Sequence, residues 1–288
     1  MPEQSETGAA PAVAAGTTTE TTNASPRLKE VEIEGEKFFI AEGDLLLDED
    51  ELGIYQQQQE TLARERALKS EKAALGSADI VEAEPARLVG VTENGKLVRW
   101  EPGTVLSYCV LKNTFSNTNY QMVRENMAQA TAGWEAICGV RFQYRADLDE
   151  SPTTTPAGVL FVVREIDAQG QFIASAFFPN GPKNRRRVLI DPSYYREGLT
   201  FDRVGVLRHE LGHVLGFRHE HIRSGAPAAC PDESTAETFD FTPYDPNSVM
   251  HYFCGGVGKP ELAITELDRT GAQKLYGPPL NTFVFATQ

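Results

Sequence analysis

The sequence predicts an α+β fold, because short apolar strands and amphipathic helices follow one another between residues 86 and 280. Apolar side chains recur at three- to four-residue steps from Tyr120 to Ile137, which predicts a helix with one buried face. A second long helix is expected from Phe201 to Leu215. We therefore expect one domain in which a mixed sheet packs on these helices.

Turn residues and a helix cap indicate the other elements of this domain. Asn94-Gly95 and Pro102-Gly103 are turn signals between apolar runs. Thr265 and Asp268 have capping-box spacing, with Asp in place of the usual Glu, and predict a helix from Thr265 to Tyr276. The expected strands are Leu88 to Val98, Val105 to Leu111, Val140 to Tyr144, Val159 to Ile166, Phe172 to Phe178 and Val188 to Ile190.

The N-terminal part of the chain has a different composition. Residues 1–27 are rich in Thr, Ala, Ser, Glu and Pro and are expected to be disordered. The alternation from Lys29 to Ile40 predicts a strand or hairpin, and Leu52 to Leu75 predicts an exposed helix with a thin apolar face. A helix with so narrow an apolar face must pack on another part of the protein. The expected divisions are a leader at 1–27, a segment with one strand and one helix at 28–85, a domain at 86–280 and a tail at 281–288.

Composition and charge limit the class of partner. The 288 residues carry a net charge of −14, which argues against nucleic acid, because phosphate binding needs a basic surface. No apolar run approaches the roughly 18 residues of a membrane span, and a monomer is expected. The first residues lack the basic and apolar regions of a Sec signal peptide. We nevertheless expect export, with a cytoplasmic location as the alternative.

The histidines of the chain form the strongest chemical pattern. Residues 209 to 220 read HELGHVLGFRHE. Four residues along a helix correspond to about 400° of rotation and about 6 Å of rise, so His209 and His213 share one face and can meet one ion. Gly216 can adopt the left-handed conformation that ends a helix, which brings His219 back towards the pair. Three nitrogen ligands with an open position are typical of catalytic zinc.

This motif resembles that of the metzincins, and Ser248-Val-Met250-His-Tyr252 is similar to their Met-turn. Glu220 after the third histidine and Tyr252 after Met-His are similar to the astacin branch. The sequence departs from that branch after Arg223, where Ser-Gly-Ala-Pro replaces the usual acidic run. The resemblance implies a zincin-like α+β catalytic domain: a mixed, mostly parallel twisted sheet, an active-site helix and a C-terminal subdomain.

The resemblance also implies roles for individual residues. His209, His213 and His219 would bind one catalytic Zn²⁺, and Glu210 would be the general base. Met250 would lie beneath the ligands, and Glu220 would be a structural carboxylate, with an ordinary exposed glutamate as the alternative. Tyr252 would be an additional ligand that moves to stabilise the oxyanion, and Asp44, after Gly43, would be a ligand in a latent form. An ordinary turn is the alternative at Gly43-Asp44.

The expected activity is hydrolysis of peptide bonds in proteins by a zinc-dependent endopeptidase, through a metal-activated water. Substrate would bind extended along Phe172 to Phe178, with a plain buried strand as the alternative. A zinc hydrolase of a non-peptide carbonyl and a non-catalytic zinc-binding module are the other functions that fit the motif. The cysteines permit two disulfides, and the expected pairs are Cys109 with Cys138 and Cys230 with Cys254.

Overall fold

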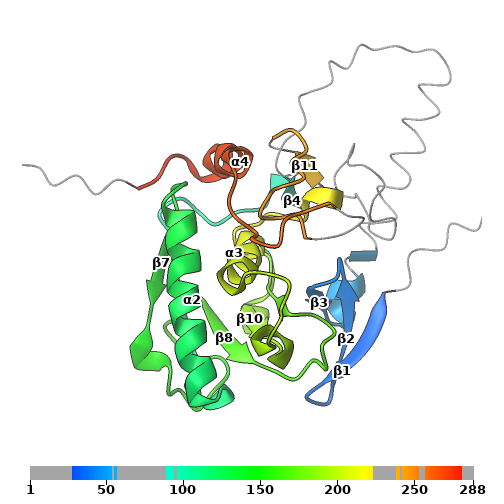
Figure 1. Cartoon of the computed structure of the whole chain (residues 1–288), viewed down its shortest axis with the longest axis vertical. Coiled ribbons are helices and arrows are strands. Elements are labelled where there is room, and N and C mark those ends of the chain that lie inside the picture. The colour runs from blue at the N-terminus through cyan, green and yellow to red at the C-terminus, as the bar shows by residue number, and fades with distance from the viewer. Residues whose placement is uncertain are drawn as a thin grey trace, which may run out of the picture.

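The computed structural model describes residues 28–53, 55–56, 89–93, 96–222, 238–240, 242–252 and 257–280. These residues contain a five-stranded sheet and two three-stranded sheets (Figure 1). The predicted leader at 1–27, the tail at 281–288 and most of the predicted helix from Leu52 to Leu75 lie outside the described residues. No helix in the described ranges is long and apolar enough to cross a membrane.

The five-stranded sheet has the order β7-β6-β8-β10-β9. Its first four strands run parallel and β9 pairs antiparallel with β10, so the predicted mixed, mostly parallel sheet is confirmed. The bounds are β6 Val105–Val110, β7 Arg141–Tyr144, β8 Phe161–Glu165, β9 Ala174–Ser175 and β10 Arg187–Ile190. The predicted strand from Phe172 to Phe178 thus has only two residues in the ladder. It lies at the sheet edge, and its side chains are buried.

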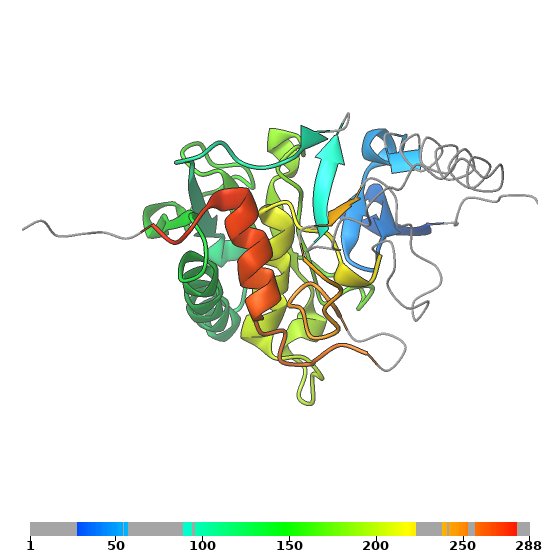
Figure 2. The same ribbon diagram turned by 90° about the horizontal axis from the view of Figure 1, so that it is seen from above.

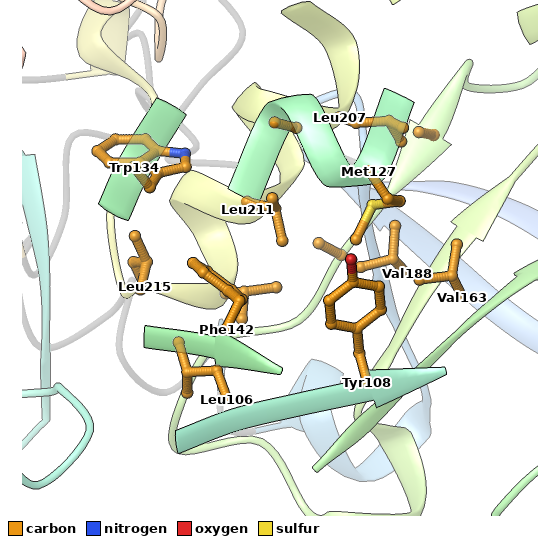
Figure 3. Close-up of a cluster of buried hydrophobic side chains, with 14 of the residues drawn as sticks. Leu106, Tyr108, Met127, Trp134, Phe142, Val163, Val188, Leu207, Leu211 and Leu215 are labelled. Atoms are coloured by element: carbon orange, nitrogen blue, oxygen red, sulfur yellow. The ribbon is translucent and has the colours of Figure 1, made fainter. Parts of the chain in front are cut away.

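Helices α2 (Asn117–Glu135) and α3 (Arg203–Val214) pack against each other beside this sheet. Between them and the strands lies the main core, whose labelled members in Figure 3 are Leu106, Tyr108, Met127, Trp134, Phe142, Val163, Val188, Leu207, Leu211 and Leu215. Helix α4 (Glu266–Tyr276) adds Leu275 to the same core and lies alongside α3 in Figure 2. It begins at Thr265 with the predicted capping box.

The N-terminal segment, residues 28–53, forms a separate sheet of β1 (Lys29–Ile33), β2 (Glu36–Ala41) and β3 (Leu45–Leu47). The predicted hairpin from Lys29 to Ile40 is confirmed as β1 and β2, and β3 was not predicted. Figure 1 shows this sheet on the far side of the molecule from β7. It is held there by a second apolar cluster, whose main members are Ile33, Phe38, Ile40, Ile166, Phe172 and Leu189.

A third sheet lies next to the end of α3. It consists of β4 (Val89–Glu93), β5 (Lys96–Leu97) and β11 (Thr238–Asp240), all antiparallel. Val91 N donates to Gly216 O at 2.9 Å, which joins β4 to the residues that follow α3. The predicted strand from Leu88 to Val98 is therefore the hairpin β4–β5, while β11 was not predicted.

The expected disulfide between Cys109 and Cys138 is wrong, because both thiols are free and buried. Side chains alternate across β6, so Tyr108 and Val110 face the main core while Cys109 packs with Leu111 and Val162 on the other face. Cys138, after α2, belongs to the main core, so the two thiols lie in different clusters. Cys230 and Cys254 lie outside the described residues.

Candidate metal centre

Three histidine rings converge at the end of α3. His209 and His213 come from the helix and His219 from the segment after it, and all three are buried. The Nε2 atom of His219 lies 3.1 Å from Nε2 of His209 and 3.2 Å from Nε2 of His213. The structure therefore brings together the three histidines that the spacing predicts.

The turn at Gly216 makes this convergence possible. Gly216 has a φ of +91°, and Phe217 N donates to Gly212 O at 2.9 Å, which closes the last turn of α3. A Cβ at Gly216 would lie 2.8 Å from Val98 O, so a side chain would be both strained and crowded. The predicted left-handed glycine is confirmed.

Backbone carbonyls determine which ring nitrogens face the centre. Nδ1 of His209 lies 2.7 Å from Val249 O, and Nδ1 of His213 lies 2.7 Å from Phe217 O. A carbonyl only accepts, so each Nδ1 carries the proton and each Nε2 presents a lone pair. Nε2 of His219 lies 3.1–3.2 Å from both of these lone pairs and carries at most one proton, whereas a cation at this point can bind all three rings.

Asp44 of the N-terminal segment completes this set. Its Oδ2 lies 3.1 Å from Nε2 of His219 and 3.3 Å from Nε2 of His209, and its Oδ1 lies 3.8 Å from Nε2 of His213. The four ligand atoms lie within 4.8 Å of one another. Four ligands at tetrahedral corners, each about 2.0–2.1 Å from zinc, are about 3.3–3.4 Å apart, so this donor set fits Zn²⁺.

The ionisation behaviour of the neighbouring groups suits a metal centre. Burial lowers the pKa of His219 to about 3, so its ring stays neutral and able to bind a cation. Burial, and then the charge of Asp44, raise the pKa of Glu210 well above its ordinary value. Oε2 of Glu210 is buried and has no hydrogen-bond partner among the described residues. Such a carboxylate is suited to accept a proton.

The turn that contains Met250 packs beneath the three histidines. Met250 is fully buried, and a Cβ at Gly212, between the two helical histidines, would collide with Met250 Sδ and crowd Trp134. The same turn provides Val249 O, which holds His209. The structure thus places Met250 beneath these histidines, as the resemblance implied.

Tyr252 is directed towards the N-terminal segment. Its ring centroid lies 4.6 Å from that of His219, and its hydroxyl donates a 2.5 Å hydrogen bond to Glu42 O. Gly43, with a φ of +87°, passes so close that a Cβ there would lie 2.6 Å from the Tyr252 hydroxyl. The phenol is therefore next to the centre and held by the residues before Asp44.

Three residues around the centre were not predicted from the sequence. The buried Glu42 pairs with Arg218, and its Oε2 lies 3.5 Å from Nδ1 of His219. Asp268 of α4 accepts hydrogen bonds from Ser248 Oγ at 2.5 Å and Val249 N at 2.9 Å, which fixes the Met-turn. The ion pair of Glu42 with Arg218 joins segments that are distant in the chain, so no local sequence pattern predicts it. Asp268 was predicted only as a helix cap.

Comparison with known proteins finds similarity to metalloproteinases over part of the chain. The matrixin family model matches residues 99–227. Zinc metalloproteinase nas-3 of Caenorhabditis elegans is 33% identical over 84 residues, 26% of this chain and 27% of that protein. An astacin-like metalloendopeptidase of Coturnix japonica is 42% identical over 62 residues, 17% of this chain and 15% of that protein. Over these residues the chain is similar to matrixins and to astacin-like metalloendopeptidases. It spans less than a third of the length of either relative.

Solved structures also resemble this chain. Myroilysin superposes with a TM-score of 0.46 at 18% identity, over 67% of this chain and 100% of the other. High choriolytic enzyme 1, a hatching enzyme zinc-protease from Oryzias latipes, gives a TM-score of 0.41 at 18% identity, over 62% and 94%.

The astacin-like Glu220 is fully buried, so the alternative of an ordinary exposed glutamate is wrong. Its Oε1 accepts a 2.8 Å hydrogen bond from Asp245 N, and its backbone N donates to Met250 O at 2.9 Å. Glu220 thus ties the segment that carries His219 to the residues around Met250. Arg223, which also carried the resemblance, lies outside the described residues.

Proposed function

We propose that this protein is a zinc-dependent endopeptidase with His209, His213 and His219 as the ligands of one Zn²⁺. The observation that carries the proposal is the convergence of three Nε2 atoms, two of them on rings whose Nδ1 atoms are directed at carbonyl oxygens. This donor set has three nitrogens and no thiolate, which is typical of catalytic and not of structural zinc.

Glu210 is the proposed general base. Zinc, when bound, would polarise the scissile carbonyl and acidify the attacking water. The raised pKa of Glu210 suits the transfer that follows, in which its carboxylate takes the proton of the water and passes it to the leaving amine. Glu210 is a buried residue of α3, which keeps its carboxylate in a fixed position for both steps.

Tyr252 is the proposed donor to the oxyanion, with an additional role as a ligand. Its ring makes an edge-to-face contact with His219 at a centroid distance of 4.6 Å. This contact supports a position of the Tyr252 hydroxyl next to the reacting carbonyl. In this structure its proton is given to Glu42 O. Removal of the N-terminal segment would free that proton for the oxyanion.

Asp44 supports a latent form of the enzyme. Its carboxylate lies at the position that an open zinc site needs for water and substrate. The N-terminal segment around it is anchored by apolar packing and by ion pairs to the catalytic domain, such as Glu34 with Arg164 at 2.9 Å. We infer that activation requires this segment to leave, which is consistent with a division of the chain at about residue 86.

Peptide substrates are proposed to bind extended along Phe172 to Phe178. The support is the position of β9 at the edge of the five-stranded sheet, where an added strand can pair with the backbone. We also propose that the enzyme is monomeric and exported. Export rests on the family resemblance alone, since the expected Cys109–Cys138 bridge does not exist. Cell fractionation that finds the protein only in the cytoplasm would contradict it.

The proposed function can be tested with casein and an ester substrate. The full chain and its Asp44→Ala variant are assayed with and without a chelator, and zinc is then restored. We expect the variant to cleave casein, to lose this activity with chelator and to regain it with zinc. Cleavage of the ester alone would instead indicate a hydrolase of non-peptide carbonyls, and inactivity on both substrates with zinc bound would indicate a binding module.

A further inference from the structure

We propose that a cavity on the face of the five-stranded sheet opposite α2 and α3 binds a phosphate or sulfate group, held by Arg187 and Lys183. Side chains alternate along each strand of a sheet. Val163 of β8 and Val188 of β10 belong to the main core and are drawn with it in Figure 3. Their neighbours Arg164 and Arg187 therefore lie on the opposite face, where both line this cavity. None of the described residues that line it belongs to the metal centre.

The wall of this cavity is basic. Among the described residues that line it there is no Asp or Glu, although the chain has 41 acidic residues against 27 Lys and Arg. Cations and neutral hydrogen-bond donors lie together in the wall, namely Arg164, Lys183, Arg186, Arg187, Thr154 and Asn184. The cavity measures about 570 Å³, which is a size typical of sites for small molecules. The wall thus favours a small molecule that carries an anionic group.

Arg187 is a half-buried cation that lacks a negative partner. Burial, and then the charges of Arg185 and Arg164, lower its pKa to about 10. Its guanidinium lies over the Phe38 ring at 5.5 Å, and no carboxylate of the described residues forms an ion pair with it. Glu34 pairs instead with Arg164, at 2.9 Å. A bound oxyanion would supply the charge that Arg187 lacks.

Lys183 provides a second available charge. It begins the short 3-10 helix that precedes β10, whose first residue is Arg187. The Lys183 side chain is exposed, and in the described part of the chain it has no ion-pair partner. A guanidinium can donate two parallel hydrogen bonds to two oxygens of a phosphate or sulfate, and an ammonium can donate to a third. A carboxylate has only two oxygens, so a tetrahedral oxyanion uses these donors more fully.

The N-terminal segment reaches the same arginines from the other side. A second cavity, of about 260 Å³, is lined by Arg164 and Arg187 together with Glu34. Both carboxylate oxygens of Glu34 accept hydrogen bonds from Arg164 at 2.9 Å. Glu34 therefore repels an anion at Arg187 and occupies two N–H groups of Arg164 that the anion could otherwise use. Removal of this charge should strengthen anion binding.

The test is titration calorimetry of the zinc-loaded full chain in a buffer of low ionic strength without phosphate or sulfate. The probes are glucose 6-phosphate, glucose 6-sulfate, inorganic phosphate and glucose. We expect both esters to bind and glucose not to bind. Equal affinity for inorganic phosphate would assign the site to the free ion, whereas tighter binding of the esters would assign it to an esterified small molecule. Absence of binding by all three anions would overturn the proposal.

Matched variants assign the binding to this cavity. Arg187→Gln should weaken the binding of the esters roughly 10-fold or more, as for a lost charge-assisted hydrogen bond. Lys183→Gln should weaken it less, and Glu34→Gln should strengthen it. Arg124→Gln and Glu125→Gln make the same changes in charge on α2, at the opposite face of the sheet, and should leave the affinity nearly unchanged. Equal shifts at the two faces would indicate only the net charge of the chain and would overturn the site.

A melting measurement provides a second readout that is independent of peptide hydrolysis. Glucose 6-sulfate should raise the melting temperature of the wild-type chain, because a ligand that binds only the folded state stabilises it. The same concentration should leave the melting temperature of Arg187→Gln nearly unchanged. A rise in Arg187→Gln as large as in wild type would contradict the proposal. If Arg187→Gln does not fold, the opposite shifts expected for the exposed Lys183→Gln and Glu34→Gln decide the question in the same assay, and shifts of equal sign would contradict it.

Discussion

The hydroxyl of Tyr252 donates a 2.5 Å hydrogen bond to the carbonyl oxygen of Glu42. This bond joins a proposed catalytic phenol of the Met-turn region to the segment that carries Asp44. The same contact that anchors the segment therefore withholds the Tyr252 proton from the reaction. The proposed latent form thus has two parts, a carboxylate at the metal centre and a phenol that is already hydrogen-bonded.

Tyr252→Phe should lower kcat by about 10²–10³ in enzyme cut at about residue 86, because one oxyanion donor is lost. KM should change little, and zinc should stay bound by three imidazoles. Tyr244→Phe is a matched control, since that hydroxyl lies 2.9 Å from His251 Nε2 and not at the centre. Steady-state kinetics with metal analysis check this. Wild-type kcat in Tyr252→Phe would leave only a packing role for Tyr252.

Asp44→Ala should activate the uncut full chain. A charge-assisted contact contributes about 1.5–3 kcal/mol, so its loss should raise the open fraction and the initial rate roughly 10- to 100-fold. Asp50→Ala, which removes an exposed carboxylate of the same segment, should have no such effect. Equal rates in wild-type protein and Asp44→Ala, with zinc bound in both, would argue against Asp44 as the inhibitory ligand.

Asp268 should make stability depend on pH. Burial raises its pKa to about 6, against 3.8 for an ordinary aspartate. Between these values the folded state holds a proton that the unfolded state has lost, so this group's contribution to the free energy of unfolding decreases as pH rises. The full decrease, from well below pH 4 to above pH 6, is about 3 kcal/mol.

The measurement is urea unfolding of the metal-free full chain and its Asp268→Asn variant at several pH values. The advantage of wild type over the variant should shrink as pH rises from 4 to 7. Asparagine can accept through only one oxygen, so the variant also loses bonds to Ser248, Val249 or Thr265 at every pH. A difference that is independent of pH would contradict the raised pKa.

Local patterns predicted the parts of the site that depend on local geometry. The spacing of His209 and His213 follows from the helical repeat, and the turn at Gly216 follows from the need for a positive φ. Period-two alternation on β6 could also have placed Cys109 opposite the main core. The prediction of a Cys109–Cys138 disulfide failed because it did not consider which side of the sheet Cys109 faces.

The pairings between distant segments could not be read from the sequence. Strands β3 and β11 have three residues each and are defined by their partners, not by a pattern of their own. Glu42 and Arg218 lie far apart in the chain, and each is an ordinary charged residue until the fold buries both. Such contacts depend on packing between the N-terminal segment and the catalytic domain.

We propose that zinc held by three histidines and a proton-accepting Glu210 together hydrolyse peptide bonds. The direct measurement compares Glu210→Gln and His213→Ala, each combined with Asp44→Ala in the full chain, for zinc content, melting temperature and casein hydrolysis. Glu210→Gln should keep about one zinc and a similar melting temperature while hydrolysis falls by orders of magnitude. His213→Ala should lose both metal and activity. Comparable hydrolysis by Glu210→Gln would contradict the account.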